Sequence, residues 1–278
     1  DTQRYCGAQT IFFDTAGSVP LHRPVYDNMF GDTLSYQWVI TGATGYSYTS
    51  GDSTEASPTI SFNQAGTYIV TITFTNECGF DTARQIIIID PFPVAEFTVN
   101  DTTQCLSSNS FVFTNTSNIG SGTISYLWSF SVTANDTSTQ VNPTKVYADT
   151  GVYTVTLITT SDNGCIDTAV QNVYVYPQPT PAFTINDTTQ CLNGNSFVFT
   201  NTSTISTGTL GYSWRFGDGT TSTQTNPTKT YTIAGTYTVT LITTSNNGCI
   251  DSAKGTVYVY PKPDMAFTVN DTAQCLLG

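Results

Sequence analysis

The chain has few charged residues, and very few of these are basic. Asp, Glu, Lys and Arg make up 10% of its 278 residues, against about a quarter in ordinary globular proteins. Lys and Arg number 8 against 20 for Asp and Glu, which gives a formal net charge of -12. Such an acidic surface repels phosphate backbones, so we do not expect nucleic acid as a partner.

Long hydrophobic runs are also missing. No apolar stretch approaches the roughly 18 residues that a membrane-spanning helix requires, so membrane insertion is not expected. The sequence also starts without an initiator Met or a signal peptide. We therefore expect it to be a part of a longer sequence.

Catalytic and metal-binding motifs are absent as well. His22 is the sole histidine, so any Ser-His-Asp or Cys-His site would have to use it. No G-x-S-x-G, HExxH, P-loop or GxGxxG motif stands in a suitable context, and there is no CxxC pair. We interpret His22 as an ordinary loop residue and predict that the chain is not an enzyme and needs no cofactor.

A repeat with a period of about 85 residues dominates the sequence. The phrase NDTTQCL occurs at 100–106 and 186–192, and NDTAQCL follows at 270–276. Tryptophans keep the same period, because Trp128 and Trp214 lie 214 minus 128, or 86, residues apart. A more divergent copy comes first, in which Tyr36-Gln37-Trp38 matches Tyr126-Leu127-Trp128.

Each repeat has the alternation of β-strands. In GTYTVTLITT, Tyr237, Val239 and Leu241 share one face, while Thr238 and Thr240 share the other. Segments such as NNG, GDG and NP supply turns, and no helical period persists. About seven short strands in roughly 85 residues predict a β-sandwich.

These patterns predict an all-β chain of tandem Ig-like sandwiches. Links such as VYVYPQPTPAF carry proline at alternate positions and should be short and stiff, so the array is predicted to be an elongated rod. We predict a divergent domain at 1–92, without its first strand and with a long apolar loop at 19–34. Two further domains follow at 93–179 and 180–263, and 264–278 is the first strand of another repeat.

The last repeat resembles the polycystic kidney disease (PKD) domain. The segment WRFGDGTTSTQTNPTKTYTIAGTYTVTLITTS carries that family's aromatic strand, FGDG turn, Asn-Pro and G-x-Y-x-V-x-L pattern, here at Trp214, 216–219, 226–227 and 235–241. The middle repeat has SFSVTAND in place of FGDG, and the first has lost the GDG turn. With its repeated cysteine phrases, the chain is similar to PKD arrays in large surface and secreted proteins of Bacteroidota.

This resemblance implies a non-enzymatic extracellular structural array. The chain would be a stalk or filament segment of a large cell-surface adhesin or fibre, with self-assembly as an option. The alternative is an accessory spacer or carbohydrate-binding module of a secreted polysaccharide-degrading enzyme, and a third reading is a surface-layer component. Expected partners are further repeats of the same polypeptide, identical chains in a fibre and surface glycans. The expected location is extracellular, secreted or at the cell surface.

Seven cysteines on this period indicate an oxidising compartment. One pairing stays within repeats, Cys6–Cys78, Cys105–Cys165 and Cys191–Cys249, with the partner of Cys275 outside the chain. It has a difficulty, since the first strand connection and the final hairpin of a simple sandwich lie at opposite poles. A rival pairing, Cys78–Cys105 and Cys165–Cys191, is as regular in spacing but must fold back across a joint. Both stay open, with the first preferred.

Asp followed by Ser or Thr and then by a small or apolar residue, or by Thr, recurs at fixed places. This resembles the O-glycosylation signal of secreted Bacteroidota proteins, although Asp-Thr is also good turn chemistry that duplication would copy. The predicted acceptors are Thr15, Thr33, Thr82, Thr102, Thr168, Thr188, Ser252 and Thr272.

Two further stretches are candidate sites. The extra loop of the first repeat carries apolar side chains that either cover their own domain or contact a neighbouring chain or ligand; they are Leu21, Val25, Tyr26, Met29 and Phe30. Asp218, in the GDG turn, is a candidate calcium ligand because calcium takes hard oxygen ligands. The other reading is that Asp218 caps its own turn.

Overall fold

The computed structural model describes residues 2–14, 35–77, 79–130 and 136–268. In these segments the regular structure is β-strand, apart from one 3₁₀ turn at Leu106–Ser108. The chain divides into two compact units, of which the first holds the first repeat and most of the second. Unit 1 comprises Asp1–Thr102, Phe111–Lys145 and Tyr153–Val173, and unit 2 comprises Thr103–Ser110, Val146–Val152 and Tyr174–Gly278.

The first repeat is built from two sheets. A four-stranded sheet has the order β1-β7-β6-β3, with β1 (Thr2–Cys6), β7 (Gly79–Asp90), β6 (Gly66–Asn76) and β3 (Ser35–Gly42). A three-stranded sheet has the order β2-β5-β4, with β2 (Gln9–Phe12), β5 (Thr59–Phe62) and β4 (Tyr46–Ser50). Strand β1 runs parallel to β7, and the other pairs are antiparallel.

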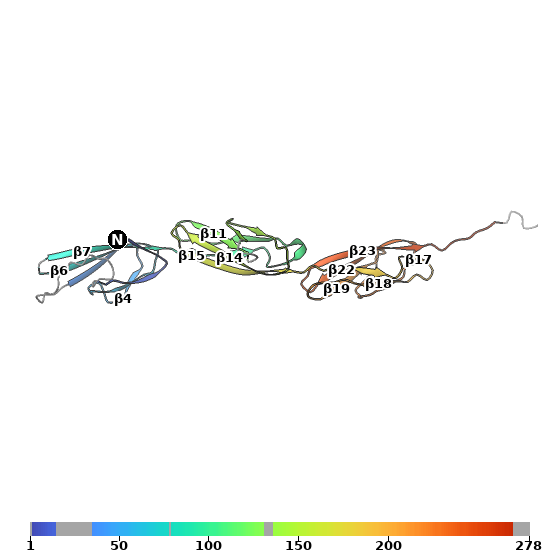
Figure 1. Cartoon of the computed structure of the whole chain (residues 1–278), viewed down its shortest axis with the longest axis horizontal. Helices are drawn as coiled ribbons and strands as arrows, with labels where there is room; N and C mark the ends of the chain where they lie inside the picture. Colours follow the sequence, from blue (N-terminus) through green and yellow to red (C-terminus); the bar gives the residue numbers. More distant parts are fainter. Residues whose placement is uncertain (1, 15–34, 78, 131–135, 269–278) are drawn as a thin grey trace, which may run out of the picture. The chain divides into compact units, whose positions relative to one another are not determined.

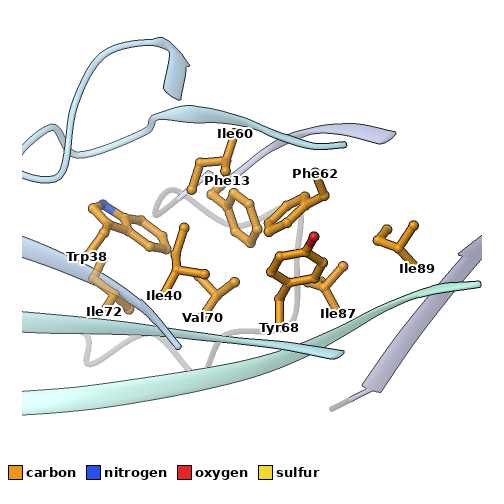
Figure 2. Packing of buried hydrophobic residues seen from close by; sticks show 10 residues of the cluster. All are labelled: Phe13, Trp38, Ile40, Ile60, Phe62, Tyr68, Val70, Ile72, Ile87 and Ile89. Atoms are coloured by element: carbon orange, nitrogen blue, oxygen red, sulfur yellow. The ribbon is translucent and has the colours of Figure 1, made fainter. Parts of the chain in front are cut away.

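Aromatic side chains from both sheets fill the space between them (Figure 2). Phe13 lies 5.4 Å from Trp38 between ring centroids, and Phe62 lies 4.7 Å from Tyr68. In β6, Tyr68 and Val70 are at most 1% exposed, as expected of residues that share one face of a strand. The alternation seen in the sequence therefore places one face of each long strand in the core.

The second and third repeats have the same strand order as each other. In the second, the sheets are β13-β10-β8 and β12-β11-β14-β15-β9; in the third, β21-β18-β16 and β20-β19-β22-β23-β17. The strands of the second repeat are β8 (Phe97–Val99), β9 (Thr103–Cys105), β10 (Phe111–Asn115), β11 (Ile124–Ser129), β12 (Thr137–Ser138), β13 (Thr144–Lys145), β14 (Gly151–Ser161) and β15 (Ile166–Tyr176).

The third repeat is dominated by a long hairpin of β22 and β23, which Figure 1 shows side by side. Its strands are β16 (Phe183–Ile185), β17 (Thr189–Cys191), β18 (Phe197–Asn201), β19 (Leu210–Arg215), β20 (Thr221–Ser222), β21 (Thr228–Lys229), β22 (Gly235–Ser245) and β23 (Ile250–Tyr260). The tandem β-sandwich fold predicted from the sequence is confirmed. The predicted domain limits and the rod shape stay predictions.

The tryptophans that set the period also have one structural role. Each is at most 3% exposed, and each indole N–H needs a hydrogen-bond partner when it is buried. In all three repeats Nε1 donates to a backbone carbonyl oxygen, at Glu55 for Trp38 (2.8 Å), Gln140 for Trp128 (2.9 Å) and Gln224 for Trp214 (2.9 Å). The indole therefore fixes the segment that follows its own strand against the core.

Candidate functional site: disulfide-bonded joints between repeats

Two disulfide bonds join successive repeats. Cys6 of the first repeat is bonded to Cys165 of the second, with their Cα atoms 5.5 Å apart. Cys105 of the second repeat is bonded to Cys249 of the third, with a Cα separation of 5.6 Å. Each bond therefore connects the first cysteine of one repeat to the hairpin cysteine of the next, and we call each such connection a joint.

The pairing within repeats that the sequence favoured, Cys6–Cys78, Cys105–Cys165 and Cys191–Cys249, is wrong. The third repeat shows why: Cys191 pairs with Tyr260 at the end of β23, whereas Cys249 directly precedes its start. Strand β23 has 11 residues, which separates its ends by roughly 33 Å at about 3.3 Å per residue. A disulfide needs Cα atoms within about 7 Å.

The rival pairing, Cys78–Cys105 and Cys165–Cys191, is wrong as well. Cys105 and Cys165 are each bonded to a different partner, and Cys191 is a free, exposed thiol. The expectation that the first strand connection and the final hairpin of a single sandwich lie at opposite poles was correct. Bonding to the next repeat removes it, because the exit pole of one repeat meets the hairpin of the following one at the joint.

The first cysteine of each repeat lies where the chain leaves that repeat. It ends a short strand that runs parallel to the repeat's last strand, and it pairs with the residue that immediately precedes the proline-rich link. The pairs are Cys6 with Asp90, Cys105 with Tyr176 and Cys191 with Tyr260. This register brings the thiol of Cys6 and of Cys105 within reach of the repeat that comes after the link.

The second cysteine is presented by a tight hairpin turn. Gly164 has a φ of 83°, in the left-handed region that glycine adopts without strain, and its N–H donates to the Ser161 carbonyl (3.0 Å). The Ser161 hydroxyl accepts from the N–H of Cys165 (3.0 Å). Gly248, Ser245 and Cys249 repeat these contacts, so the turn fixes the cysteine at its end.

A polar network adjoins the Cys6–Cys165 bond. The Asp90 carboxylate, 7% exposed, pairs with the Arg4 guanidinium (3.3 Å) and accepts from the Asn163 amide nitrogen (3.0 Å). Arg4 also donates to the Asn163 side-chain oxygen. Arg4 and Asp90 belong to the first repeat and Asn163 to the second. The joint is thus held by hydrogen bonds as well as by the disulfide.

The link between the first two repeats lies against the chain beside Cys6. Gly7 has a φ of 66°, and a Cβ there would come within 2.2 Å of the Phe92 ring. Its N–H donates to the Asp90 carbonyl oxygen (2.8 Å). Only glycine accommodates both the backbone angle and the close ring, so Gly7 keeps the link next to the disulfide.

The second joint has a different bridge, made by Gln178 of the link. Its amide nitrogen donates to the carbonyl oxygen of Ile250 in the third repeat (2.6 Å), and its side-chain oxygen accepts from the Ser107 hydroxyl of the second (3.1 Å). Ile250 directly follows the bonded Cys249. Each joint therefore has its own disulfide bond, and the two joints differ in the polar residues around that bond.

Each bond closes a large covalent loop, with sequence separations of 159 and 144 residues. In the chain-entropy model, a loop of this size limits the unfolded chain enough to stabilise the folded state by about 5 kcal/mol. The loops overlap between Cys105 and Cys165, so their contributions do not simply add. The arrangement is a covalent cross-link between successive repeats.

Asparagine side chains hold the turn after the first cysteine, and the sequence reasoning missed them. Asn109 is 4% exposed; its amide nitrogen donates to the carbonyl oxygens of Leu106 and Tyr147 (both 2.9 Å), and its oxygen accepts from the Tyr147 N–H (2.7 Å). Asn195 makes the equivalent contacts in the third repeat. The repeated C-L-x-x-N spacing was the available signal. Arg4 and Gln178 had no such signal, since each is found at one joint. Asn163 does recur, because Asn247 also directly precedes a Gly-Cys pair, but its contacts with Arg4 and Asp90 belong to the first joint.

The predicted glycan acceptors are partly accessible. Thr82, Thr168, Thr188 and Ser252 are exposed, and Thr102 is half-buried. Asp81 and Asp251 each accept a hydrogen bond from the next backbone N–H, as turn chemistry requires. Thr15, Thr33, Thr272, Cys78, Cys275 and the predicted contact loop with Leu21, Val25, Tyr26, Met29 and Phe30 lie outside the described residues, as does His22. Glycosylation stays a prediction.

Asp218 has protein partners on both carboxylate oxygens. Oδ1 accepts from the N–H and hydroxyl of Thr220 (3.0 and 2.6 Å), and Oδ2 lies 2.6 Å from Lys229 Nζ. A calcium ion would have to displace Lys229. In the second repeat, which lacks the GDG turn, Asp136 pairs with Lys145 at 2.6 Å. The ion pair is therefore a structural feature of both repeats, supplied from different positions.

Replacing Asp218 with Asn should destabilise the third repeat by about 1 to 2 kcal/mol at pH 7. Burial raises the pKa of this carboxyl, but hydrogen bonds from Lys229 and Thr220 outweigh burial and lower it from 3.8 to about 2. Because the folded pKa is the lower one, the contribution is present above about pH 4 and is lost as the pH falls towards 2.

Denaturant unfolding of the wild type and Asp218→Asn at pH 7 and pH 2.5 measures this difference. The difference in the free energy of unfolding between the wild type and Asp218→Asn should be smaller at pH 2.5 than at pH 7. Asp264→Asn, at an exposed position after β23, is the control and should stay within about 0.5 kcal/mol of the wild type. An equal gap at both pH values would show that ionisation of Asp218 does not stabilise the fold.

Among the described residues, no three His, Cys, Asp or Glu side chains gather as a metal site would require. No helix in that part of the chain is long and apolar enough to cross a membrane.

A family model described as the PKD domain matches residues 91–175 and again 178–260, together more than half of the chain. The chain belongs to the PKD domain family. PKD domains and disulfide bonds are both typical of extracellular proteins. The array is of a non-catalytic domain type.

Two proteins with PKD domains are similar to this chain over about one repeat. Over 69 residues the chain is 44% identical to the pre-pro-metalloprotease PrtV of Vibrio cholerae serotype O1, a match that covers 24% of this chain and 8% of PrtV. The crystal structure of the PKD1 domain from PrtV is 38% identical, covering 30% of this chain and 98% of that domain, with a TM-score of 0.27. The crystal structure of the PKD1 domain of Vibrio anguillarum Epp is 31% identical. This match covers 31% of this chain and 96% of that domain, with a TM-score of 0.27.

Proposed function

We propose that this chain is a load-bearing segment of an extracellular structural array, the stalk or filament of a large cell-surface adhesin or fibre. The observation that supports this most directly is the pair of disulfides between successive repeats, Cys6–Cys165 and Cys105–Cys249. A bond inside one sandwich would stabilise that sandwich alone. A bond between sandwiches limits how far two of them can separate.

The position of each bond supports a mechanical role. Cys6 pairs with Asp90, the last residue before the link, so the disulfide and the link connect the same two repeats at the same pole. Two covalent connections side by side oppose bending and twisting, which a single proline-rich link resists only through its stiffness. Arg4, Asp90 and Asn163 add hydrogen bonds across the first joint.

The partners that this role requires are further repeats of the same polypeptide, with identical chains in a fibre as a second kind of partner. Secretion or surface display follows from the need for an oxidising compartment, where such bonds form and persist. Glycans at Thr82, Thr168, Thr188 and Ser252 would cover exposed positions on or beside strands and discourage association of sheets through their edges.

An accessory role in a secreted enzyme is the second candidate, as a spacer or a carbohydrate-binding module. The match to PrtV, which is named a pre-pro-metalloprotease, favours it. The carbohydrate-binding form of this candidate differs from the structural array in what the isolated chain does: a binding module is retained on its polysaccharide, whereas a structural segment is not.

Electron microscopy of the chain, oxidised and then reduced, tests the proposal. The angle between neighbouring repeats should be narrowly distributed in the oxidised chain and clearly broader after reduction of the two joints. The same preparation should pass unretarded through insoluble cellulose, chitin and xylan. An unchanged angle distribution would contradict the structural role, and retention on one polysaccharide would favour the accessory module.

A further inference from the structure

Cys191 occupies the position in the third repeat that Cys6 and Cys105 occupy in the first two. It ends β17, which runs parallel to β23, and it pairs with Tyr260, the last residue before the link Pro261-Lys262-Pro263. The N–H of the next residue, Leu192, donates to the Tyr260 carbonyl (2.8 Å). Gly7 makes the same contact with the Asp90 carbonyl, also at 2.8 Å.

Cys191 nevertheless differs from its two counterparts in bonding. It is a free, exposed thiol, whereas Cys6 and Cys105 are bonded to the hairpin cysteine of the following repeat. Both hairpin cysteines in the described part of the chain, Cys165 and Cys249, are already used by those bonds. The position of Cys191 therefore calls for a hairpin cysteine of another repeat.

We propose that Cys191 is a cross-linking site whose partner is the hairpin cysteine of the PKD repeat that follows Tyr260 in the same polypeptide. This inference rests on the proposed structural array and extends it to a continuous series of joints. The sequence after the link supports it, because 266–276 reads AFTVNDTAQCL and matches AFTINDTTQCL at 182–192. Each repeat would then carry one cysteine for the repeat before it and one for the repeat after it.

The bond forms by thiol–disulfide exchange. The Cys191 thiolate attacks a disulfide oxidant, such as oxidised glutathione, and a mixed disulfide forms as one glutathione thiolate leaves. The thiolate of the hairpin cysteine then attacks Cys191 Sγ and releases the second glutathione. The two cysteines lose two protons and two electrons, and the oxidant is reduced to two thiols.

The test extends the full chain by one repeat. A copy of residues 194–263 is added after Leu277, and the copy of Ile250 is changed to Val as a mass tag. After folding in a glutathione redox buffer, free thiols are alkylated and the chain is cleaved before aspartate. This cleavage places Cys191 in the peptide 187–217, Cys105 in 101–135 and Cys249 in 218–250.

In the 278-residue chain, peptide 187–217 should be alkylated. In the extended chain its alkylation should fall at least tenfold, and the peptide should be recovered joined to the tagged copy of 218–250. The matched control carries Cys249→Ser in the appended copy only, and should restore alkylation of Cys191.

Alkylation of Cys191 that persists in a folded extended chain would overturn the proposal, as would its bonding to Cys275. The joints themselves are read in the same digest, since peptides 1–13 with 162–166 and 101–135 with 218–250 report Cys6–Cys165 and Cys105–Cys249. Failure of Cys191 alone therefore leaves the array proposal intact. If the added repeat does not fold, the same digest of the natural full-length protein decides: a free Cys191 there contradicts the inference, and a bond to a hairpin cysteine supports it.

Discussion

Warm dilute acid should cut this chain at Asp90–Pro91 without separating the two fragments until a reductant is added. This is the one Asp–Pro bond in the sequence, and Asp–Pro bonds are the first peptide bonds to break in acid. It lies in the link between the first two repeats, inside the loop closed by Cys6–Cys165. The fragments 1–90 and 91–278 should therefore run as one species on a non-reducing gel and as two on a reducing gel.

Two single substitutions make this result specific. Cys165→Ser should release the fragments without a reductant, because Cys105–Cys249 does not enclose the cut. Cys249→Ser removes the other joint and should leave the cut chain in one piece. Free thiols are alkylated beforehand to prevent exchange. Separation of the wild-type fragments without a reductant would mean that the bonds lie within repeats, and the structure of the joints would be wrong.

The single-repeat features were readable from the sequence because they depend on local pattern. Tyr237, Val239 and Leu241 alternate with threonines, and period-2 burial follows from strand geometry alone. The tryptophan period located the core residue of each sandwich, and Trp128 and Trp214 are fully buried. These predictions need no knowledge of how one repeat contacts the next.

The joints could not be predicted from the sequence, because they depend on how neighbouring repeats meet and not on local pattern. Cysteine spacing along the chain is equally regular for bonds within repeats and between them, so spacing could not choose. The choice depends on register: the parallel pairing of Cys191 with Tyr260 puts this cysteine at the opposite end of β23 from Cys249. Parallel pairing of a three-residue strand such as β17 leaves too little pattern in the sequence to be recognised.

The ion pair of Asp218 and Lys229 is an intermediate case. Asp218 was recognised in the sequence as a turn residue and as a candidate calcium ligand. Its ion pair with Lys229 was not predicted. The second repeat reaches the same arrangement through Asp136, which lies 136 minus 128, or 8, residues after its tryptophan, whereas Asp218 lies 218 minus 214, or 4, residues after the equivalent tryptophan. Comparison of aligned residues would miss this equivalence, because only the position of the lysine is common to both repeats.

Pulling the chain from both ends should give a stretched length that the disulfides, and not the number of residues, determine. Between Cys6 and Cys249 the shortest covalent path crosses to Cys165, follows the backbone back to Cys105, and crosses again. That path contains 165 minus 105, or 60, residues, against 249 minus 6, or 243, in the reduced chain. At about 3.6 Å per residue, the fully stretched lengths are about 220 and 870 Å.

Single-molecule force spectroscopy with handles at the two ends measures this difference. Cys105→Ser should leave a path of 249 minus 165, or 84, residues, which is about 300 Å. Cys191→Ser is the matched control and should leave the wild-type length unchanged, because Cys191 is not bonded in this chain. Lengthening in that control would place Cys191 in a bond within its own repeat and exclude the joint at Cys249. A stretched length of about 220 Å in both the wild type and this control would mean that force passes from repeat to repeat through the disulfides even after the sandwiches unfold.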